Sequence, residues 1–251
     1  MAQQVRREEE RMKDFVVLDL ETTGLTPKTD RILEIGAIKV VDGAVKERYS
    51  TFINPQMEIP PRITGLTGIT QDMVKNAPLR EEAVRKLVEF CRDLPLLGHN
   101  ILFDYSFVKH DAVNLGLEFE KEALDTLTVA RLALPELESR SLEYLCGYFG
   151  ICRENAHRAM DDAQETLELY RILEQRYAAE HPEWFRTKPL VCKVKRKGPV
   201  TRAQIGYLKD LTEYHNLKLD VEIESLTKNE ASRMIDTILS TYGRIVRKRN
   251  V

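Results

Sequence analysis

The sequence predicts an α/β fold in which helices pack on a mixed sheet, followed by a small helical module. Three extended segments come first, and shorter ones then alternate with amphipathic helical patterns, as expected for such a sheet. A stretch rich in proline and basic residues then precedes two further helical patterns. We therefore expect four parts: a polar N-terminal segment over 1–13, a main domain over 14–180, a basic linker over 181–200 and a helical module over 201–251.

The first three extended segments predict an antiparallel meander. Residues 15–20 are apolar except for Asp19, which is typical of a strand buried on both faces. Residues 31–41 form the second segment. Asp42-Gly43 favours a tight hairpin turn into the third segment, over 45–53.

Helical periodicity and capping residues define most of the remaining elements. The prolines between residues 55 and 61 predict a loop, and Thr70 then caps a short helix. We expect short strands over 94–98 and 123–126, and helices over 81–91, 103–115, 127–134, 142–149 and 160–179. In the C-terminal module we expect helices over 201–216 and 226–242, the second opened by a capping box of Thr227 and Glu230.

The composition is that of a globular protein without a membrane segment. Of its 251 residues, 43% are hydrophobic and 31% are charged, and no apolar run approaches the length that crosses a bilayer. The first residues carry no apolar core of the kind that a secretory signal needs. The four cysteines show no metal-binding or paired spacing, so we expect reduced thiols. These features predict a cytoplasmic protein.

Charge is distributed unevenly along the chain. Residues 1–180 contain 23 Lys and Arg against 32 Asp and Glu, whereas residues 181–251 contain 15 against 8. A basic tail on an acidic body often meets a polyanion. The alternative is a solvated helical face that happens to be rich in lysine.

Asp19 and Glu21 are the first candidate site residues. They are two residues apart in a predicted strand, so their side chains leave the same face. Neighbouring carboxylates repel each other, and a hard divalent cation such as Mg²⁺ or Mn²⁺ relieves that repulsion. The alternative is a strand end that carries two solvated acids.

Two later segments supply further groups of this kind. Asp104 falls in the first turn of a predicted helix just beyond a strand end, where α/β folds gather their sites, although the helix dipole alone also favours an acid there. Of the adjacent pair Asp161 and Asp162, only Asp162 continues the apolar stripe of the long helix. The stripe of Asp161 runs through Glu165, Glu168 and Ile172 and is expected to face solvent. His157 must precede that helix to share a site with Asp162.

These segments resemble a known family. Asp19-Leu20-Glu21-Thr22-Thr23-Gly24, His99-Asn100-Ile101-Leu102-Phe103-Asp104 and His157-Arg158-Ala159-Met160-Asp161-Asp162 are similar to the three motifs of the DEDDh exonucleases. That family includes the proofreading epsilon subunit of bacterial DNA polymerase III, ribonuclease T and the TREX enzymes. The resemblance covers about residues 14–178 and implies a ribonuclease H-like fold with a five-stranded mixed sheet.

The resemblance also implies a mechanism. Two divalent ions, Mg²⁺ or Mn²⁺, would be held by Asp19, Glu21, Asp104 and Asp162. His157 would act as the general base toward the attacking water, since imidazole is a side chain well suited to that role. The implied reaction is 3′→5′ removal of nucleoside monophosphates.

Substrate contacts are implied at two places. The turn Thr22-Thr23-Gly24-Leu25 resembles the one that receives the terminal nucleotide, with Leu25 as an apolar wedge. His99, Asn100 and Phe103 of the second motif, together with Thr67, are the other expected contacts, and Phe103 matches a base-stacking position. The alternative for Leu25 and Phe103 is packing in the core.

The expected partner is DNA with a free 3′ end, single-stranded or frayed. One alternative is an exoribonuclease of the ribonuclease T type, and another is a nuclease subunit that acts only within a polymerase or other DNA-processing complex. A non-catalytic binding protein is disfavoured because all four acids and the histidine are present. The C-terminal module is expected to be a nucleic-acid tether or else an interaction, dimerisation or stabilising element. The sequence does not predict the oligomeric state.

Overall fold

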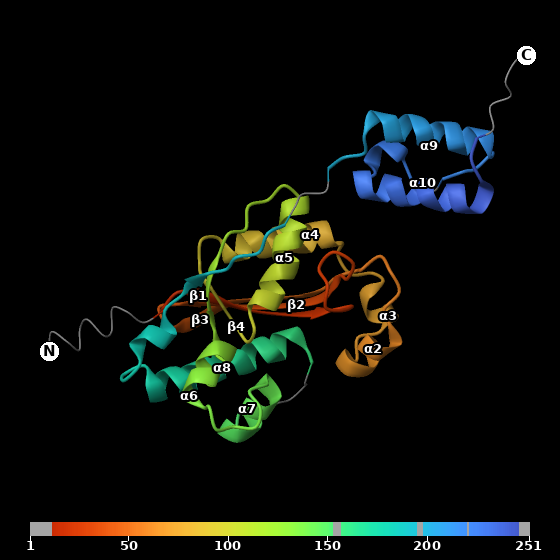
Figure 1. Cartoon of the computed structure of the whole chain (residues 1–251). Helices are drawn as coiled ribbons and strands as arrows, with labels where there is room; N and C mark the ends of the chain where they lie inside the picture. The colour runs from red at the N-terminus through yellow and green to blue at the C-terminus, as the bar shows by residue number, and fades with distance from the viewer. Residues whose placement is uncertain (1–11, 153–156, 195–197, 220, 246–251) are drawn as a thin grey trace, which may run out of the picture. The chain divides into compact units, whose positions relative to one another are not determined.

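The computed structural model describes residues 12–152, 157–194, 198–219 and 221–245 (Figure 1). Residues 1–11 of the expected polar segment, residues 195–197 of the basic run and the last six residues lie outside the described part. The chain divides into two compact units, Met1–Val194 and Lys195–Val251. The boundary falls inside the interval 181–200 that was expected to be a linker. Among the described residues, no helix has the length and apolar character required to traverse a bilayer.

The first unit is built on a mixed sheet of six strands in the order β3-β2-β1-β4-β5-β6. The strands are β1 (Phe15–Thr22), β2 (Ile32–Val41), β3 (Ala44–Phe52), β4 (Leu96–Gly98), β5 (Glu122–Asp125) and β6 (Lys188–Pro189). β1, β2 and β3 form the antiparallel meander that the sequence predicted, and β4 and β5 join it in parallel. The α/β fold class is therefore confirmed, with six strands instead of five.

The additional strand, β6, lies within the interval expected to be a linker. It pairs antiparallel with β5 at the edge of the sheet, and a 3₁₀ turn, η1 (Pro182–Phe185), precedes it. Phe185 of that turn is buried and packs near Tyr170, while Trp184 stacks on His181. These aromatic contacts fix a stretch whose proline and charge content alone indicates a linker.

Helices cover both faces of the sheet (Figure 1). On one face lie α4 (Arg80–Cys91) and α5 (Leu102–Asn114), and on the other α6 (Thr126–Ala133), α7 (Leu142–Phe149) and α8 (Ala159–Tyr177). β1 serves both cores because its side chains alternate: Val16, Leu18 and Leu20 belong to the α4–α5 core, whereas Phe15 and Val17 belong to the α8 core. Asp19 and Glu21 continue the second set, so they emerge on the face that α8 covers.

Two short helices fill the stretch between β3 and α4. They are α2 (Pro61–Thr67) and α3 (Gln71–Val74). The sequence predicted α3 after Thr70 but a loop in place of α2. Pro61 starts α2 because its fixed φ suits a first helical position, and Ile63 and Ile69 are buried in a small core with Leu33.

The second unit is a pair of helices, α9 (Arg202–Tyr214) and α10 (Lys228–Tyr242), with a 3₁₀ turn η2 (Ile223–Ser225) between them. Capping boxes open both helices. The Gln204 amide in the first turn of α9 donates to the Lys228 carbonyl and to Ser232, so the two N-termini lie side by side. Leu208, Leu211, Ala231 and Ile238 form the centre of its apolar core. The two predicted helices and the Thr227–Glu230 box are confirmed.

Candidate metal centre

β1 carries the first two acids on the face that α8 covers. In the antiparallel ladder Asp19 lies opposite Gly36, and Glu21 lies opposite Glu34. Residues directly opposite in such a ladder project from the same face. Glu34 is 2% exposed, so it brings a third carboxylate to this face of the sheet.

Asp104 and Asp162 each come from the first turn of a helix. Asp104 opens α5, is buried, and accepts a hydrogen bond of 3.1 Å from the backbone N–H of Leu20 in β1. Asp162 opens α8 and is buried, whereas Asp161 is partly exposed, as the helical stripe predicted.

The same stripe argument was wrong for Glu165, which was expected to face solvent. Glu165 is 3% exposed, and the Cys146 thiol of α7 lies 3.6 Å from its carboxylate. α8 packs against α6 and α7 as well as against the sheet, so its buried face is wider than a single stripe.

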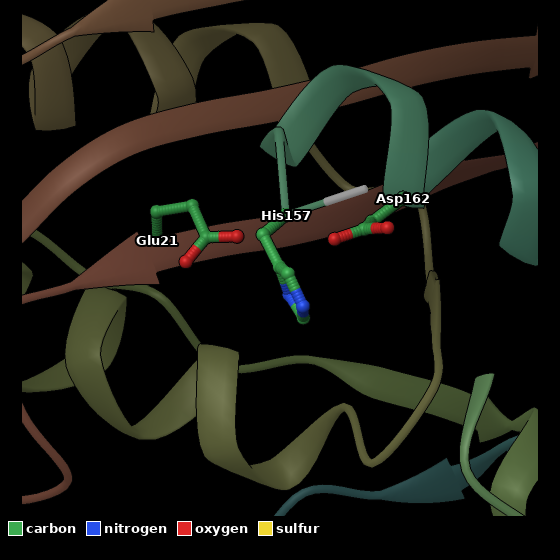
Figure 2. Close-up of side chains that lie close together, drawn as sticks. All are labelled: Glu21, His157 and Asp162. Atoms are coloured by element: carbon green, nitrogen blue, oxygen red, sulfur yellow. The ribbon is translucent and has the colours of Figure 1, made fainter. Parts of the chain in front are cut away.

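His157 lies just before α8 with a positive φ of 62°. Glu21, His157 and Asp162 each offer one atom that could bind a metal ion, and these three atoms lie within 4.8 Å of one another. Figure 2 shows the two carboxylates pointing toward the imidazole from either side. The tertiary structure thus brings together side chains from β1, from the loop before α8 and from α8 itself.

The acids at this site resist ionisation. Loss of water contact raises the pKa of Asp19 well above its usual value, and the nearby carboxylates of Asp104, Asp162, Glu21 and Glu34 raise it further. Burial, followed by repulsion from Asp162 and Glu34, raises the pKa of Glu21 to about 8, although Arg158 opposes this.

Asp104 follows the same pattern. Burial raises the pKa of Asp104 well above normal, even though its backbone hydrogen bonds act in the opposite direction. Burial and nearby like charges thus raise the pKa values of three carboxyl groups in one place.

This donor set fits divalent cations. Carboxylate oxygens are the ligands that Mg²⁺ and Mn²⁺ prefer, and a cation at this position would favour the ionised form of each raised acid. The carboxyl groups of Asp19, Glu21, Asp104 and Asp162 influence one another electrostatically. The group of ligand-type atoms within 4.8 Å of one another contains Glu21, His157 and Asp162.

Two functional candidates lie here that the sequence reasoning missed. Glu34 accepts hydrogen bonds from the Arg158 guanidinium at 3.1 Å to Nε and 2.8 Å to Nη2. The sequence offers one indication of the role of Glu34: it lies two residues before Gly36 in a strand that pairs with β1. Only the ladder register and the placement of α8 connect them.

The turn after β1 is held from within the protein. Thr22 donates to the Gly24 carbonyl at 2.6 Å, and the Thr23 hydroxyl accepts from the Arg31 N–H at 2.9 Å. A Cβ on Gly24 would lie 2.5 Å from the Asp30 carboxylate, so a larger residue there would require the Asp30 side chain to move. Leu25, at the tip, is 77% exposed, so core packing does not account for it.

The other expected substrate contacts differ in accessibility. Asn100 is exposed, and Phe103 is partly buried with its ring 5.1 Å from that of Phe107. Thr67 is buried and bonds to the Ile63 carbonyl. Both ring nitrogens of His99 are engaged, with Thr126 at 2.9 Å and the Arg140 carbonyl at 2.8 Å. A nucleotide contact by His99 would require one of these bonds to be given up.

The chain is similar to PolC-type DNA polymerases III of several bacteria. It is 40% identical over 159 residues to the PolC-type DNA polymerase III of Clostridium perfringens. This match covers 63% of this chain and 11% of that protein. It is 43% identical over 157 residues to the PolC-type enzyme of Caldanaerobacter subterraneus, covering 62% of this chain and 11% of that protein. The chain is 35% identical over 206 residues to the PolC-type enzyme of Thermotoga petrophila. This match covers 81% of this chain and 14% of that protein. The chain therefore spans only about a tenth of the length of these relatives.

Solved structures share the fold. Exonuclease X in complex with 5′ overhanging duplex DNA matches with a TM-score of 0.52 and 23% identity, over 65% of this chain and 93% of that chain. E. coli exonuclease I in complex with a dA16 oligonucleotide matches with a TM-score of 0.59 and 22% identity, over 69% and 42%. At these identities the likeness shows the fold, which is ribonuclease H-like.

The family follows from the sequence match. The RNase T family model, described as an exonuclease, matches residues 16–170, which is more than half of the chain. That interval begins in β1 and ends in α8, so it includes every segment that contributes a side chain to the acidic cluster. This chain belongs to the exonuclease family.

Proposed function

We propose that this protein is a metal-dependent 3′→5′ exonuclease that releases nucleoside monophosphates from single-stranded or frayed 3′ ends of DNA. The observation that carries the proposal is the cluster of acids around His157. Asp19, Glu21, Asp104 and Asp162 come from three separate segments and influence one another strongly enough to raise the pKa values of at least three of them. Such a cluster destabilises the fold unless a ligand compensates for it.

Each residue of the centre has a proposed part in hydrolysis. Asp19, Glu21, Asp104 and Asp162 would hold two Mg²⁺ or Mn²⁺ ions, which when bound supply positive charge to the oxygens of the phosphodiester group. A ring nitrogen of His157 takes the proton of the attacking water. Its place between the carboxylates of Glu21 and Asp162 stabilises the imidazolium that forms.

The turn after β1 is the proposed floor for the terminal nucleotide. Its backbone is fixed by the bonds of Thr22 and Thr23, so its groups are in place before substrate arrives. Leu25 projects from it into solvent. A large apolar side chain in that position can insert between the last two bases, and such stacking tolerates any sequence.

A second candidate is a nuclease that acts within a polymerase assembly. The relatives are PolC-type DNA polymerases III, and this chain corresponds to about a tenth of their length. In this case the free chain would cleave weakly, and a polymerase partner would deliver the 3′ end. Proofreading would then be its role.

The C-terminal unit is proposed to tether the nucleic acid, mainly through the basic residues that precede and follow its helical pair. Residues 198–243, which hold the helical pair, contain five Lys and Arg against seven Asp and Glu. The positive charge of the tail instead lies on either side, at Lys193, Lys195, Arg196 and Lys197 and at Arg244, Arg247, Lys248 and Arg249. Basic runs of this kind bind the phosphate backbone without reading sequence.

The proposed activity is tested with 5′-labelled DNA and RNA of one sequence, each single- and double-stranded, in Mg²⁺, Mn²⁺ or EDTA. We expect a ladder that shortens from the 3′ end of single-stranded DNA and that disappears in EDTA. Faster cleavage of RNA would favour the ribonuclease T-type alternative. Cleavage only after addition of a PolC-type polymerase would favour the second candidate, and no cleavage under any condition would refute both.

The tether is tested by ending the chain at Val194, which keeps β6 in the sheet. We expect the truncated protein to bind single-stranded DNA several-fold more weakly at low salt, with kcat nearly unchanged. As a control, replacing Arg247, Lys248 and Arg249 by glutamine should reproduce part of the loss. Equal affinity of the full and truncated proteins at low salt would contradict the tether.

A further inference from the structure

The segment that carries His157 is held against β2 by one ion pair. Arg158 follows His157 directly, and its guanidinium makes a two-point contact with the carboxylate of Glu34, at 3.1 and 2.8 Å. The same carboxylate accepts the backbone N–H of Ala159 at 3.3 Å. Glu34 therefore also satisfies an N–H at the start of α8, where Arg158 itself provides no side-chain cap.

This ion pair is well fixed on both sides. Glu34 is 2% exposed, and the Arg158 side chain is 36% exposed with its guanidinium 5.0 Å from the ring of Phe52. Two parallel bonds between a guanidinium and a carboxylate fix orientation as well as distance. Rotation about any bond of the Arg158 side chain would break at least one of the two hydrogen bonds to Glu34.

Gly36 allows the first turn of α8 to pack directly against the backbone of β2. A Cβ at this position would lie 2.1 Å from the Ala159 carbonyl oxygen and 2.4 Å from the Met160 nitrogen. The first turn of α8 therefore rests directly on the backbone of β2, opposite Asp19. Glu34 and Gly36 together set where the residues after His157 begin their helix.

His157 itself needs such support. Its φ of 62° is a left-handed conformation, which is unfavourable for a residue with a side chain. A residue held in this way keeps its geometry only when its surroundings determine it. Arg158, the next residue in the chain, is itself held by its two-point contact with Glu34.

We propose that Glu34 and Arg158 are positioning residues that set the place of His157 relative to the carboxylates of Glu21 and Asp162. Neither side chain contacts the scissile group. They act through His157, whose ring lies between those two carboxylates (Figure 2). This inference rests on the proposed function for its kinetic consequence, but the position of the ring can be measured without any reaction.

The test uses the full chain with Arg158→Lys and Glu34→Gln. Lysine keeps the positive charge but loses the two-point contact, and glutamine keeps the shape but loses the negative charge. Arg48→Gln is the matched control, because Arg48 also joins the sheet to α8 by two bonds to Gln164, at an exposed place away from His157. Thermal melting of each variant checks that the fold is retained.

The first readout is the NMR spectrum of the imidazole groups in EDTA. The chain has five histidines, and the resonances of His157 are assigned by their absence in His157→Gln. We expect them to shift and broaden in Arg158→Lys and in Glu34→Gln, while those of the other four histidines stay in place. In Arg48→Gln all five should be unchanged.

The second readout is kcat and KM on single-stranded DNA. We expect kcat to fall about 10- to 100-fold in Arg158→Lys and Glu34→Gln, as is usual for residues that orient a reacting group, with KM within about two-fold. The double variant should be no worse than the poorer single variant, because both remove one interaction.

The outcomes separate this inference from the proposed function. Unchanged His157 resonances in both variants would overturn it, whatever happens to kcat, because a loss of activity without movement of the ring is then only structural. A wild-type chain that cleaves nothing would defeat the proposed function. In that case displaced His157 resonances in EDTA would still support the positioning role.

Discussion

The protein buries two groups of charged side chains, and they differ in the balance of sign. On α5, Lys109, His110 and Asp111 are each between 5% and 6% exposed, yet opposite charges meet there. Lys109 pairs with Glu120, and Asp111 lies 3.6 Å from Arg80 and 3.3 Å from His110. At the metal centre, by contrast, buried acids have other acids as neighbours.

The pKa values record this difference. The ion pair with Lys109 lowers the pKa of Glu120 below its usual value, whereas burial and like charges raise the pKa of Glu21 to about 8. A buried charge that is compensated from within the chain supports the fold. A buried charge that is not compensated weakens the fold and awaits a ligand, so the two clusters should respond to mutation with opposite signs.

The largest effect is expected from Asp19→Asn. Activity should fall on the order of a thousand-fold or more, because a carboxylate central to the cluster is lost. The melting temperature in EDTA should rise at the same time, because a repelled and desolvated acid has been removed. Both are measured on the same preparation by cleavage of labelled DNA and by thermal melting. A lower melting temperature in EDTA would mean that this cluster is structural after all.

The two adjacent aspartates of α8 test how local the effect is. Asp162→Asn should reduce activity on the order of 100-fold, because its carboxylate points into the cluster. Asp161→Asn, one residue away and partly exposed, should change activity only a few-fold. Initial rates at saturating Mg²⁺ measure both. An equal or larger loss from Asp161→Asn would overturn the assignment of Asp162.

Asp111→Asn addresses the compensated cluster. The unfolding free energy should fall by about 1–3 kcal/mol, because Arg80 and His110 lose a buried partner. The activity of the folded protein should be retained. Urea unfolding measures the change, with Asp72→Asn as the control, since the Asp72–Lys75 pair is exposed and its loss should leave the unfolding free energy almost unchanged. A stability gain in Asp111→Asn would erase the distinction between the clusters.

The smallest expected effect is a dependence of stability on pH in EDTA. The pKa of Glu21 is about 8 in the folded protein against a usual 4.5, so between these values the unfolded chain releases a proton that the folded protein keeps. Stability therefore falls as pH rises through this range and levels off above it.

The melting temperature of the wild type should fall relative to that of Glu21→Gln between pH 5 and pH 8. Differential scanning fluorimetry at several pH values measures the two curves. A constant difference between them would show that Glu21 does not titrate in this range. Added Mg²⁺ should reduce the fall in the wild type.

Much of the site could be predicted from the sequence because its residues mark the ends of regular elements. Asp19 and Glu21 close an apolar strand, Asp104 and Asp162 open helices, and these positions are visible in the pattern of apolar residues. The burial of Asp162 followed from helical periodicity, and the structure confirms it. Where more than one surface packs on a helix the same reasoning failed, as it did for Glu165.

The remaining features depend on contacts between distant segments. β6 could not be predicted because its pairing with β5 joins residues far apart in the chain, and its two residues carry no strand pattern. In the sequence, Glu34 is a single acid in an apolar strand, and Arg158 is a single basic residue next to His157. Only the contact between them in the folded protein indicates a role.

The sequence by itself therefore determined the fold class and the types of residue that can hold a divalent cation, because these depend on local periodicity and chemistry. The tertiary structure alone decided that Glu34 lies beside these acids, and that the segment of His157 is held against β2 through Arg158. The physical reason is that electrostatic repulsion and hydrogen bonding act through a few ångströms of space, and strand register and helix packing set those distances.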